Sequence, residues 1–346
     1  MKTLLVTSYN NFSLLAHLPK GKESKSTILI LKNNKTLELN FTECYNPAFV
    51  LKHPTEPYIY VCYESIYEGA IGTYKVENNN ISLVKTVSSG GKSSCFLLFD
   101  KEMKNIININ YWDSSITIHP LKENIVCELK NKILPDSENN IYEIEDHLKN
   151  RQSTSHHHSA IFRKNKLYVP DLGKDCIDIY EYLEGDLNKV NFFQLEKCSG
   201  PRYSLILNDY MYIINELSSS IVVLKFKGEE LKFIQKISTI PNDFKDKTTA
   251  SGIKIHPNKQ FIYASNRGHN SIAIFKILET GKLELIKIQK CGGKTPRHFN
   301  ISESGKELFV ANQDSNSIIT FEIKETGELK YQNEENVNSP NFIIEI

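Results

Sequence analysis

Short segments of alternating apolar and polar residues recur along the chain and are separated by turn-forming segments. In residues 251–275 (SGIKIHPNKQFIYASNRGHNSIAIF), two alternating segments flank a Pro-Asn turn, and a third follows a short polar turn. Residues 77–80 (ENNN), 278–282 (LETGK) and 324–328 (KETGE) have the composition of turns. Alternation with a period of two in such short segments is typical of antiparallel strands. The pattern predicts an all-β fold.

The strand pattern itself repeats along the chain. One copy consists of an apolar strand, a tight turn, a second apolar strand that ends in a polar pair, and a third strand. Copies start at Pro47, Ser94, His157, Pro201, Ala250, Pro296 and, as a partial copy, Pro340. Successive starts are 44 to 49 residues apart, except for one step of 63 residues. A period of this length with about four strands per unit predicts a β-propeller, each copy forming one blade.

The two ends of the chain each supply part of one unit. Residues 339–346 (SPNFIIEI) match the first strand of a unit whose second strand is 3–9 (TLLVTSY). We therefore expect a single domain, 1–346, of seven four-stranded blades, closed by pairing of the N- and C-terminal strands in one blade. The long step locates an insertion at 133–152, acidic at first and of helical character.

Composition narrows the class of partner. The chain has 42 Lys and Arg against 41 Asp and Glu, so its net charge of +1 gives no electrostatic footprint for nucleic acid or an anionic membrane. The seven cysteines are scattered without metal or redox spacing, which is typical of reduced thiols. The N-terminal stretch has neither signal-peptide nor membrane-span character. We expect a cytoplasmic protein, monomeric or a weak homo-oligomer, with no nucleic-acid partner, no membrane partner and no cofactor.

Polar side chains gather at two equivalent positions of the units. The first strand of a blade leaves one face of the disc and the second returns to it, so the start of one and the end of the other meet on that face. These positions hold His158, Arg202, Glu216, Arg267, Arg297 and Gln313. The same positions in the units that start at Pro47 and Ser94 are expected to be more apolar. Because arginine binds carboxylate and phosphate groups bidentately, the pattern predicts a small anionic ligand at this end of the channel.

Two of these residues can move a proton. Glu216 should stay ionised among the arginines and could act as a base, and His158 can exchange a proton near neutral pH. A metal site is the competing use of residues 155–159 (SHHHS). Since neighbouring residues of a strand face opposite sides, only His156 and His158 could share an ion, and no clear carboxylate completes the set. We therefore expect no metal.

Several segments carry a family pattern: 157–175 (HHSAIFRKNKLYVPDLGKD), 200–224 (GPRYSLILNDYMYIINELSSSIVVL), 256–275 (HPNKQFIYASNRGHNSIAIF) and 292–318 (GGKTPRHFNISESGKELFVANQDSNSI), with support from 46–54 (NPAFVLKHP). In these segments the chain resembles the seven-bladed propeller lactonase family, which includes 6-phosphogluconolactonases and carboxymuconate-lactonising enzymes. The likeness covers nearly the whole chain. It implies a propeller that hydrolyses a sugar lactone, 6-phosphogluconolactone to 6-phosphogluconate in the first instance.

The resemblance also implies residue roles. The implied catalytic group is His158, Glu216, Arg267 and Arg202, and the implied rim residues that would bind substrate are Arg297 and Gln313. Asn266, beside Arg267, is a further substrate-binding candidate. Turn hydrogen bonds alone would account for Asn266. Water activated by Glu216 or His158 would attack the lactone carbonyl while arginines hold the anionic groups. The family's usual Gly-Pro-Arg-His is Gly-Pro-Arg-Tyr here, with Tyr203 expected to face away from Arg202.

Other functions stay open at this point. Within the family, the same residues could run the reverse chemistry and close a lactone from a muconate-like diacid. Outside the enzymes, propellers serve as binding scaffolds or as sensors of sugars and anions, and the fold alone does not decide between these uses. The charged character of the shared positions favours an enzyme that acts on a small anionic lactone.

Overall fold

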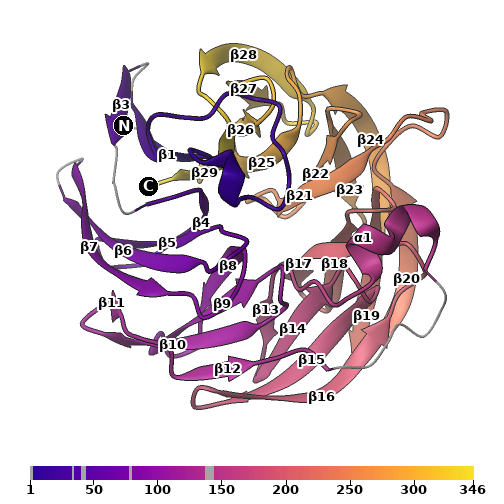
Figure 1. The fold of residues 1–346 in the computed structure, drawn as a ribbon. Helices are drawn as coiled ribbons and strands as arrows, with labels where there is room; N and C mark the ends of the chain where they lie inside the picture. Colours follow the sequence, from indigo (N-terminus) through magenta and orange to yellow (C-terminus); the bar gives the residue numbers. More distant parts are fainter. Residues whose placement is uncertain (1–2, 33–34, 40–43, 78–79, 137–143) are drawn as a thin grey trace.

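Seven antiparallel sheets stand around a central axis like the blades of a propeller (Figure 1). The computed structural model describes residues 3–32, 35–39, 44–77, 80–136 and 144–346, and the sheets are counted within these ranges. The seven-bladed β-propeller that the sequence predicts is therefore confirmed. Each blade also begins within a few residues of its predicted start.

Both ends of the chain build one blade. Strand β29 (Pro340–Glu345) pairs antiparallel with β1 (Thr3–Ser8), which is followed by β2 (Ile28–Lys32) and β3 (Lys35–Leu39). The two termini accordingly lie close together in Figure 1. Pairing with β29 satisfies the backbone groups along the edge of β1, which would otherwise be an open sheet edge. The predicted closure of the ring is confirmed.

The other six blades follow the chain in order. First strands of neighbouring blades lie in contact around the channel, as β17 and β21 do. The blades are β4 (Pro47–Lys52), β5 (Tyr58–Tyr63), β6 (Ala70–Glu77), β7 (Asn80–Ser88); β8 (Ser94–Phe99), β9 (Asn105–Asn110), β10 (Ile116–Lys122) with an outer strand split into β11 (Ile125–Val126) and β12 (Asn131–Ile133); β13 (Ile161–Arg163), β14 (Lys166–Asp171), β15 (Cys176–Leu183), β16 (Asp186–Gln194); β17 (Pro201–Leu207), β18 (Tyr210–Asn215), β19 (Ser220–Lys227), β20 (Glu230–Ser238); β21 (Thr249–Ile255), β22 (Phe261–Arg267), β23 (Ser271–Ile277), β24 (Leu283–Lys290); and β25 (Pro296–Ile301), β26 (Glu307–Asn312), β27 (Ser317–Ile323), β28 (Leu329–Asn336).

The core lies between the blades. On β22, Ile262 and Ala264 pack into one apolar cluster with β18 and β19 of the preceding blade. Tyr263, on the other face of the same strand, packs into a second cluster with β25 and β26 of the following blade. Because successive side chains of a strand point to opposite faces, a strand sandwiched between two sheets must be apolar on both. This explains why the second strands of the blades are so continuously apolar.

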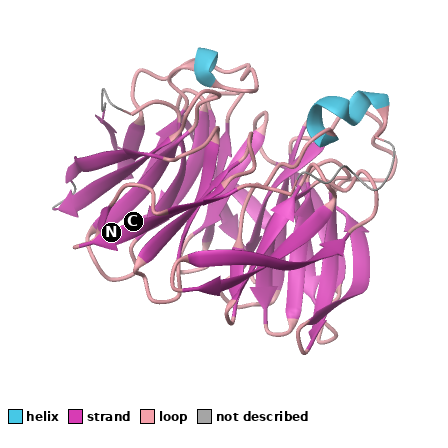
Figure 2. Ribbon diagram, turned by 60° about the horizontal axis from the view of Figure 1, so that its bottom comes forward, coloured by secondary structure: helices cyan, strands magenta, loops and turns pink. Residues whose placement is uncertain are grey.

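The described helices are short and lie on one side of the disc (Figure 2). They are η1 (Phe12–Leu14), η2 (Asp146–Leu148) and α1 (Lys149–Gln152). η2 and α1 confirm the helical character of the predicted insertion over its last residues, while 137–143 of the insertion lie outside the described residues. None of the helices in the described ranges is long and apolar enough to cross a membrane.

Candidate active site

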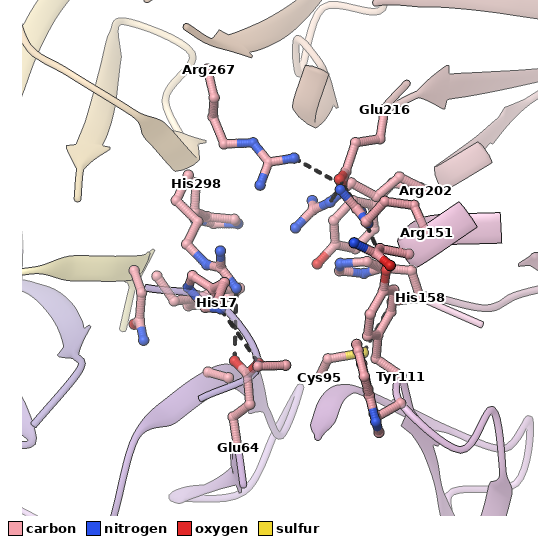
Figure 3. A pocket seen from close by; sticks show the side chains of 18 residues that line it. His17, Glu64, Cys95, Tyr111, Arg151, His158, Arg202, Glu216, Arg267 and His298 are labelled. Carbon is pink, nitrogen blue, oxygen red and sulfur yellow. Dashed lines mark hydrogen bonds and ion pairs between the residues drawn. The ribbon is translucent and has the colours of Figure 1, made fainter. Parts of the chain in front are cut away.

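A cavity of about 440 Å³ opens where the first and second strands of the blades meet (Figure 3). The register brings these strand ends together as the sequence predicts, for example Pro201 opposite Asn215 and Pro296 opposite Asn312. Of the residues expected here, five line the cavity: His158, Arg202, Glu216, Arg267 and Arg297. The inserted helix and the loop between β1 and β2 also contribute to its wall.

Glu216 is the centre of the charged part of the cavity. It directly follows β18, and its side chain is 4% exposed. Its Oε2 lies 2.9 Å from Nε of Arg202 and 2.8 Å from Nη2 of Arg267. Its Oε1 accepts a hydrogen bond from Nη2 of Arg151. One buried carboxylate thus binds three guanidinium groups.

The charge of Glu216 is fixed by these neighbours. Burial by itself would raise the pKa of this carboxyl, but Arg267, Arg151 and Arg202 together outweigh burial and hold the pKa well below its usual range. Glu216 is therefore an anion at any pH near neutrality. Burial also lowers the pKa of Arg267, to about 10, against the opposing effect of Glu216, so the guanidinium is still a cation.

The carbonyl oxygens of β21 hold two of the arginines in place. Nη1 of Arg202 donates to the oxygen of Ser251 at 2.7 Å, and Nη2 of Arg267 donates to the oxygen of Ala250 at 3.0 Å. Gly268 follows Arg267 with a φ of +90°, a conformation that glycine adopts without strain, so the chain can turn directly after the arginine. Both arginines are thereby oriented before any ligand binds.

His158 is buried beside this group of charges. Its ring lies 5.3 Å from that of Tyr111 and 5.2 Å from that of Tyr203, measured between centroids. Burial, with Arg202 acting in the same direction, lowers its pKa well below the usual value for histidine. Its Nδ1 has no hydrogen-bond partner within the described residues. His158 is therefore a neutral imidazole near pH 7, and its Nδ1 is buried without a partner among the described residues.

A second charged group lies across the cavity from Glu216 (Figure 3). Glu64 accepts a hydrogen bond from the hydroxyl of Tyr9 at 2.8 Å and lies 3.7 Å from Nη2 of Arg297. Nδ1 of His17 lies 4.0 Å from the same carboxylate. The expectation of a more apolar position in the blade that starts at Pro47 is therefore wrong, because Glu64 occupies the repeat position that Glu216 occupies in its own blade.

Tyr203 faces the cavity next to Arg202, contrary to the expectation from strand alternation. The guanidinium carbon of Arg202 lies over the ring of Tyr203, 4.7 Å from the ring centroid. The cause is a β-bulge between Pro201 and Tyr203, where the pairing with β18 shifts by one residue. An extra residue in one strand removes the alternation of side chains locally. The same shift recurs at Pro47/Phe49, Ser94/Phe96, Ala250/Ile253 and Pro296/His298.

Asn266 and Gln313 are buried but do not line the cavity. Nδ2 of Asn266 donates to the carbonyl oxygen of Thr239 at 2.8 Å and to the hydroxyl of Ser271 at 3.1 Å, so this side chain ties two blades together. Nε2 of Gln313 donates to Asp314 at 3.0 Å. Both side chains are thus bonded within the protein, and their substrate-binding role stays a prediction.

The sequence alone missed Arg151, Tyr111 and His17. Tyr111 occupies the repeat position that Glu216 and Arg267 occupy in their blades, so the repeat itself carried a signal for it. Arg151 comes from the insertion, and His17 comes from the loop after β1, which is much longer than the equivalent loops of the other blades. Nothing in the repeat pattern could have placed them in the cavity.

Within the described residues, one buried group, His157, Asp171 and Asp178, has the donor types of a metal site. The protein itself occupies these donors. Nδ1 of His157 bonds the oxygen of Ser114 at 2.9 Å, and Nε2 bonds Asp178 at 3.1 Å. His156 stacks on Tyr111 with ring centroids 4.8 Å apart. These contacts are those of a structural network that links neighbouring strands.

Comparison with known proteins agrees with this geometry. A family model described as "Lactonase, 7-bladed beta-propeller" matches residues 4–344. A relative from Formosa agariphila named 6-phosphogluconolactonase is 32% identical over 279 residues, which is 76% of this chain and 77% of the relative. A Bacillus subtilis protein of the same name is 26% identical over 263 residues, 73% of each chain. The structure of Pseudomonas aeruginosa periplasmic gluconolactonase has a TM-score of 0.87 at 20% identity, covering 100% of this chain and 99% of that one, and shows the shared fold.

Proposed function

The chain belongs to the seven-bladed β-propeller lactonase family and is a lactone-hydrolysing enzyme, and we propose that its substrate is 6-phosphogluconolactone, which it opens to 6-phosphogluconate. Two relatives with this name support the proposal from the side of the sequence. The structural observation that supports this substrate is the net positive charge of the cavity.

The cavity has a formal surplus of two positive charges. Its guanidinium groups are those of Arg151, Arg202, Arg267 and Arg297, and its carboxylates are those of Glu64 and Glu216. Burial lowers the pKa of each histidine that lines it, so these rings stay neutral near pH 7: His17, His158 and His298. A phosphate monoester carries about 1.5 to 2 negative charges at pH 7. The surplus therefore favours a phosphorylated lactone over an uncharged one.

His158 is the proposed general base. Its ring is neutral and lines the cavity, so it can take a proton from a water molecule as the water oxygen attacks the lactone carbonyl carbon. When the bond between that carbon and the ring oxygen breaks, the protonated ring returns the proton to the leaving alkoxide. The carboxylic acid that forms then loses its own proton to solvent, so the step consumes one water and yields the open-chain acid.

Arg202 and Arg267 are the proposed stabilisers of the developing oxyanion. Within the described residues, Nη2 of Arg202 and Nη1 of Arg267 carry no hydrogen bond. Glu216 and β21 hold Nε and Nη1 of Arg202 and Nη2 of Arg267. Donors fixed in this way need no reorganisation as charge develops. Glu216 is a poor base because its pKa is low, so its proposed role is to orient the arginines.

The alternative functions are not favoured. A muconate-like substrate of a lactonising enzyme would also be dianionic, but the named relatives are 6-phosphogluconolactonases. A scaffold that binds without turnover does not need a neutral buried histidine beside fixed arginine donors. The four arginines that line the cavity favour a small anionic substrate.

The proposal is tested by adding purified protein to fresh 6-phosphoglucono-δ-lactone and following proton release, with product identified by NMR. The blank without protein gives the spontaneous rate. Ring opening well above the blank, with a higher kcat/KM than for glucono-δ-lactone, is the expected result. A rate equal to the blank would refute the proposal.

A further inference from the structure

Arg151 differs from the other arginines of the cavity in its origin and its exposure. Arg202, Arg267 and Arg297 stand on strands of the propeller, whereas Arg151 stands on α1 within the insertion. The side chain of Arg151 is 35% exposed, compared with 4%, 17% and 16% for the other three. Arg151 is therefore the arginine of the cavity that is most open to solvent.

The guanidinium of Arg151 has donors to spare. Its Nη2 donates to the hydroxyl of Tyr111 at 3.2 Å and to Oε1 of Glu216. Within the described residues, its Nη1 and Nε carry no hydrogen bond. A guanidinium presents five N–H groups in a rigid plane and can give two parallel hydrogen bonds to one phosphate. Arg151 can thus bind an anionic oxygen pair while keeping its contact with Glu216.

The helix that carries Arg151 is fixed to the propeller. Nε2 of Gln152 donates to the carbonyl oxygen of Leu172, just after β14, at 3.0 Å. Leu148, at the other end of the turn, is buried. Tyr111, at the end of β9, holds the guanidinium itself. Since backbone and side chain are both held, less conformational entropy is lost when a ligand binds.

The positive charges around Glu216 are sufficient for two anionic groups of the substrate. Glu216 neutralises one of the three guanidiniums that contact it, which leaves two positive charges on this side of the cavity. If only Arg202 and Arg267 contacted Glu216, one positive charge would remain, which is enough for a single oxyanion. Hydrolysis of a phosphorylated lactone places a second anionic group in the cavity at the same time. Arg151 supplies the additional charge.

We infer that Arg151 recognises the phosphate group of the substrate and so determines specificity, an inference that rests on the proposed function. Arg202 and Arg267 act on the reacting carbonyl, and the inserted helix adds the phosphate contact. The rival role for Arg151 is to position Glu216 alone. That role would affect phosphorylated and unphosphorylated lactones equally, so the two roles are separable.

The test compares Arg151→Ala and Arg151→Lys with the wild type on 6-phosphoglucono-δ-lactone and glucono-δ-lactone. Lys149→Ala is the matched control, because Lys149 is an exposed cation on the same helix that pairs with Asp146. Charge-assisted hydrogen bonds are worth about 1.5–3 kcal/mol, so Arg151→Ala should lower the ratio of kcat/KM values, phosphorylated over unphosphorylated, roughly 10- to 100-fold. Arg151→Lys keeps the positive charge but cannot give two parallel hydrogen bonds to one phosphate, so it should give an intermediate ratio. Lys149→Ala should keep the wild-type ratio.

Calorimetry with 6-phosphogluconate and gluconate gives a readout that does not need turnover. The wild type should bind the phosphorylated acid more tightly, and Arg151→Ala should lose that preference. Equal losses on both lactones, or an unchanged preference in both Arg151 variants, would overturn the inference while leaving the proposed function intact. A wild type that does not accelerate opening of the phosphorylated lactone would refute the proposed function. Equal binding of 6-phosphogluconate and gluconate by the wild type would also overturn phosphate recognition by Arg151.

Discussion

Glu216 and Arg267 come from neighbouring blades and meet at 2.8 Å between Oε2 and Nη2, with side chains only 4% and 17% exposed. Glu216 directly follows β18 and Arg267 ends β22, and these two strands belong to different sheets. The ion pair exists only when the blades are correctly docked. The cavity is thus assembled by the same packing between blades that forms the core.

Arg267→Ala tests the oxyanion role. Removal of one preorganised donor should lower kcat/KM for the lactone roughly 100-fold, about 3 kcal/mol. Steady-state kinetics on fresh substrate measures this, with the exposed Lys232→Ala as a control that should behave as wild type. Kinetics of Arg267→Ala within twofold of the wild type would show that this arginine does not act on the reacting group.

Glu216→Gln tests the structural role of the carboxylate. It leaves three guanidiniums close together without their shared anion, and removal of one partner of a buried ion pair costs about 3–5 kcal/mol. Urea denaturation should therefore show a free energy of unfolding lower by about 3 kcal/mol, partly restored by inorganic phosphate. Glu230→Gln, a change of an exposed carboxylate, is the control. A loss for Glu216→Gln as small as that of the control would contradict this role.

The pH dependence of kcat/KM follows from the lowered pKa of His158. The neutral imidazole is the active base, and it predominates at every pH above its pKa. Because burial and Arg202 place this pKa well below 6.5, activity should stay level as pH falls through 6.5 and decline only at lower pH. A pH–rate profile of the wild type measures the inflection. An acid inflection at or above pH 6.5 would argue against His158 as the base.

Acid should destabilise the fold. Burial lowers the pKa of most described histidines with a resolved shift: His17, His119, His156, His158, His269 and His298. Their folded pKa lies below the unfolded value of about 6.5, so the unfolded chain binds more protons below that pH and stability falls. His157, whose pKa is raised, opposes this, since its contribution is present below 6.5 and is lost as pH rises through its folded pKa. Urea denaturation at pH 7 and at pH 5 should show the lower free energy of unfolding at pH 5. A higher free energy of unfolding at pH 5 would contradict this prediction.

The sequence predicts the fold well because the repeat reports backbone geometry. Residues such as Pro201 and Pro296 recur at the start of first strands, and their pairing to the ends of second strands follows from topology. That geometry also placed Arg202, Glu216 and Arg267 together. The closing strand pair β1–β29 could be predicted because each end carries only part of a unit.

The remaining parts of the site depend on features that a repeat pattern does not encode. Tyr203 faces the cavity because of a bulge, and a bulge changes side-chain direction without changing the spacing of apolar residues. Arg151 reaches Glu216 from an insertion that occurs once in the chain. Gln313 occupies an equivalent repeat position but bonds Asp314 instead of lining the cavity. Equivalent position is therefore a guide to location, while local contacts decide the role.

The most direct test of catalysis in this cavity is the rate of 6-phosphoglucono-δ-lactone opening by the wild type and by His158→Asn, measured side by side against the spontaneous rate. The wild type should open the lactone well above the spontaneous rate. His158→Asn should lose roughly 10²- to 10⁴-fold of kcat, the contribution of a general base. A wild type no faster than the blank, or a His158→Asn variant as active as the wild type, would contradict the account.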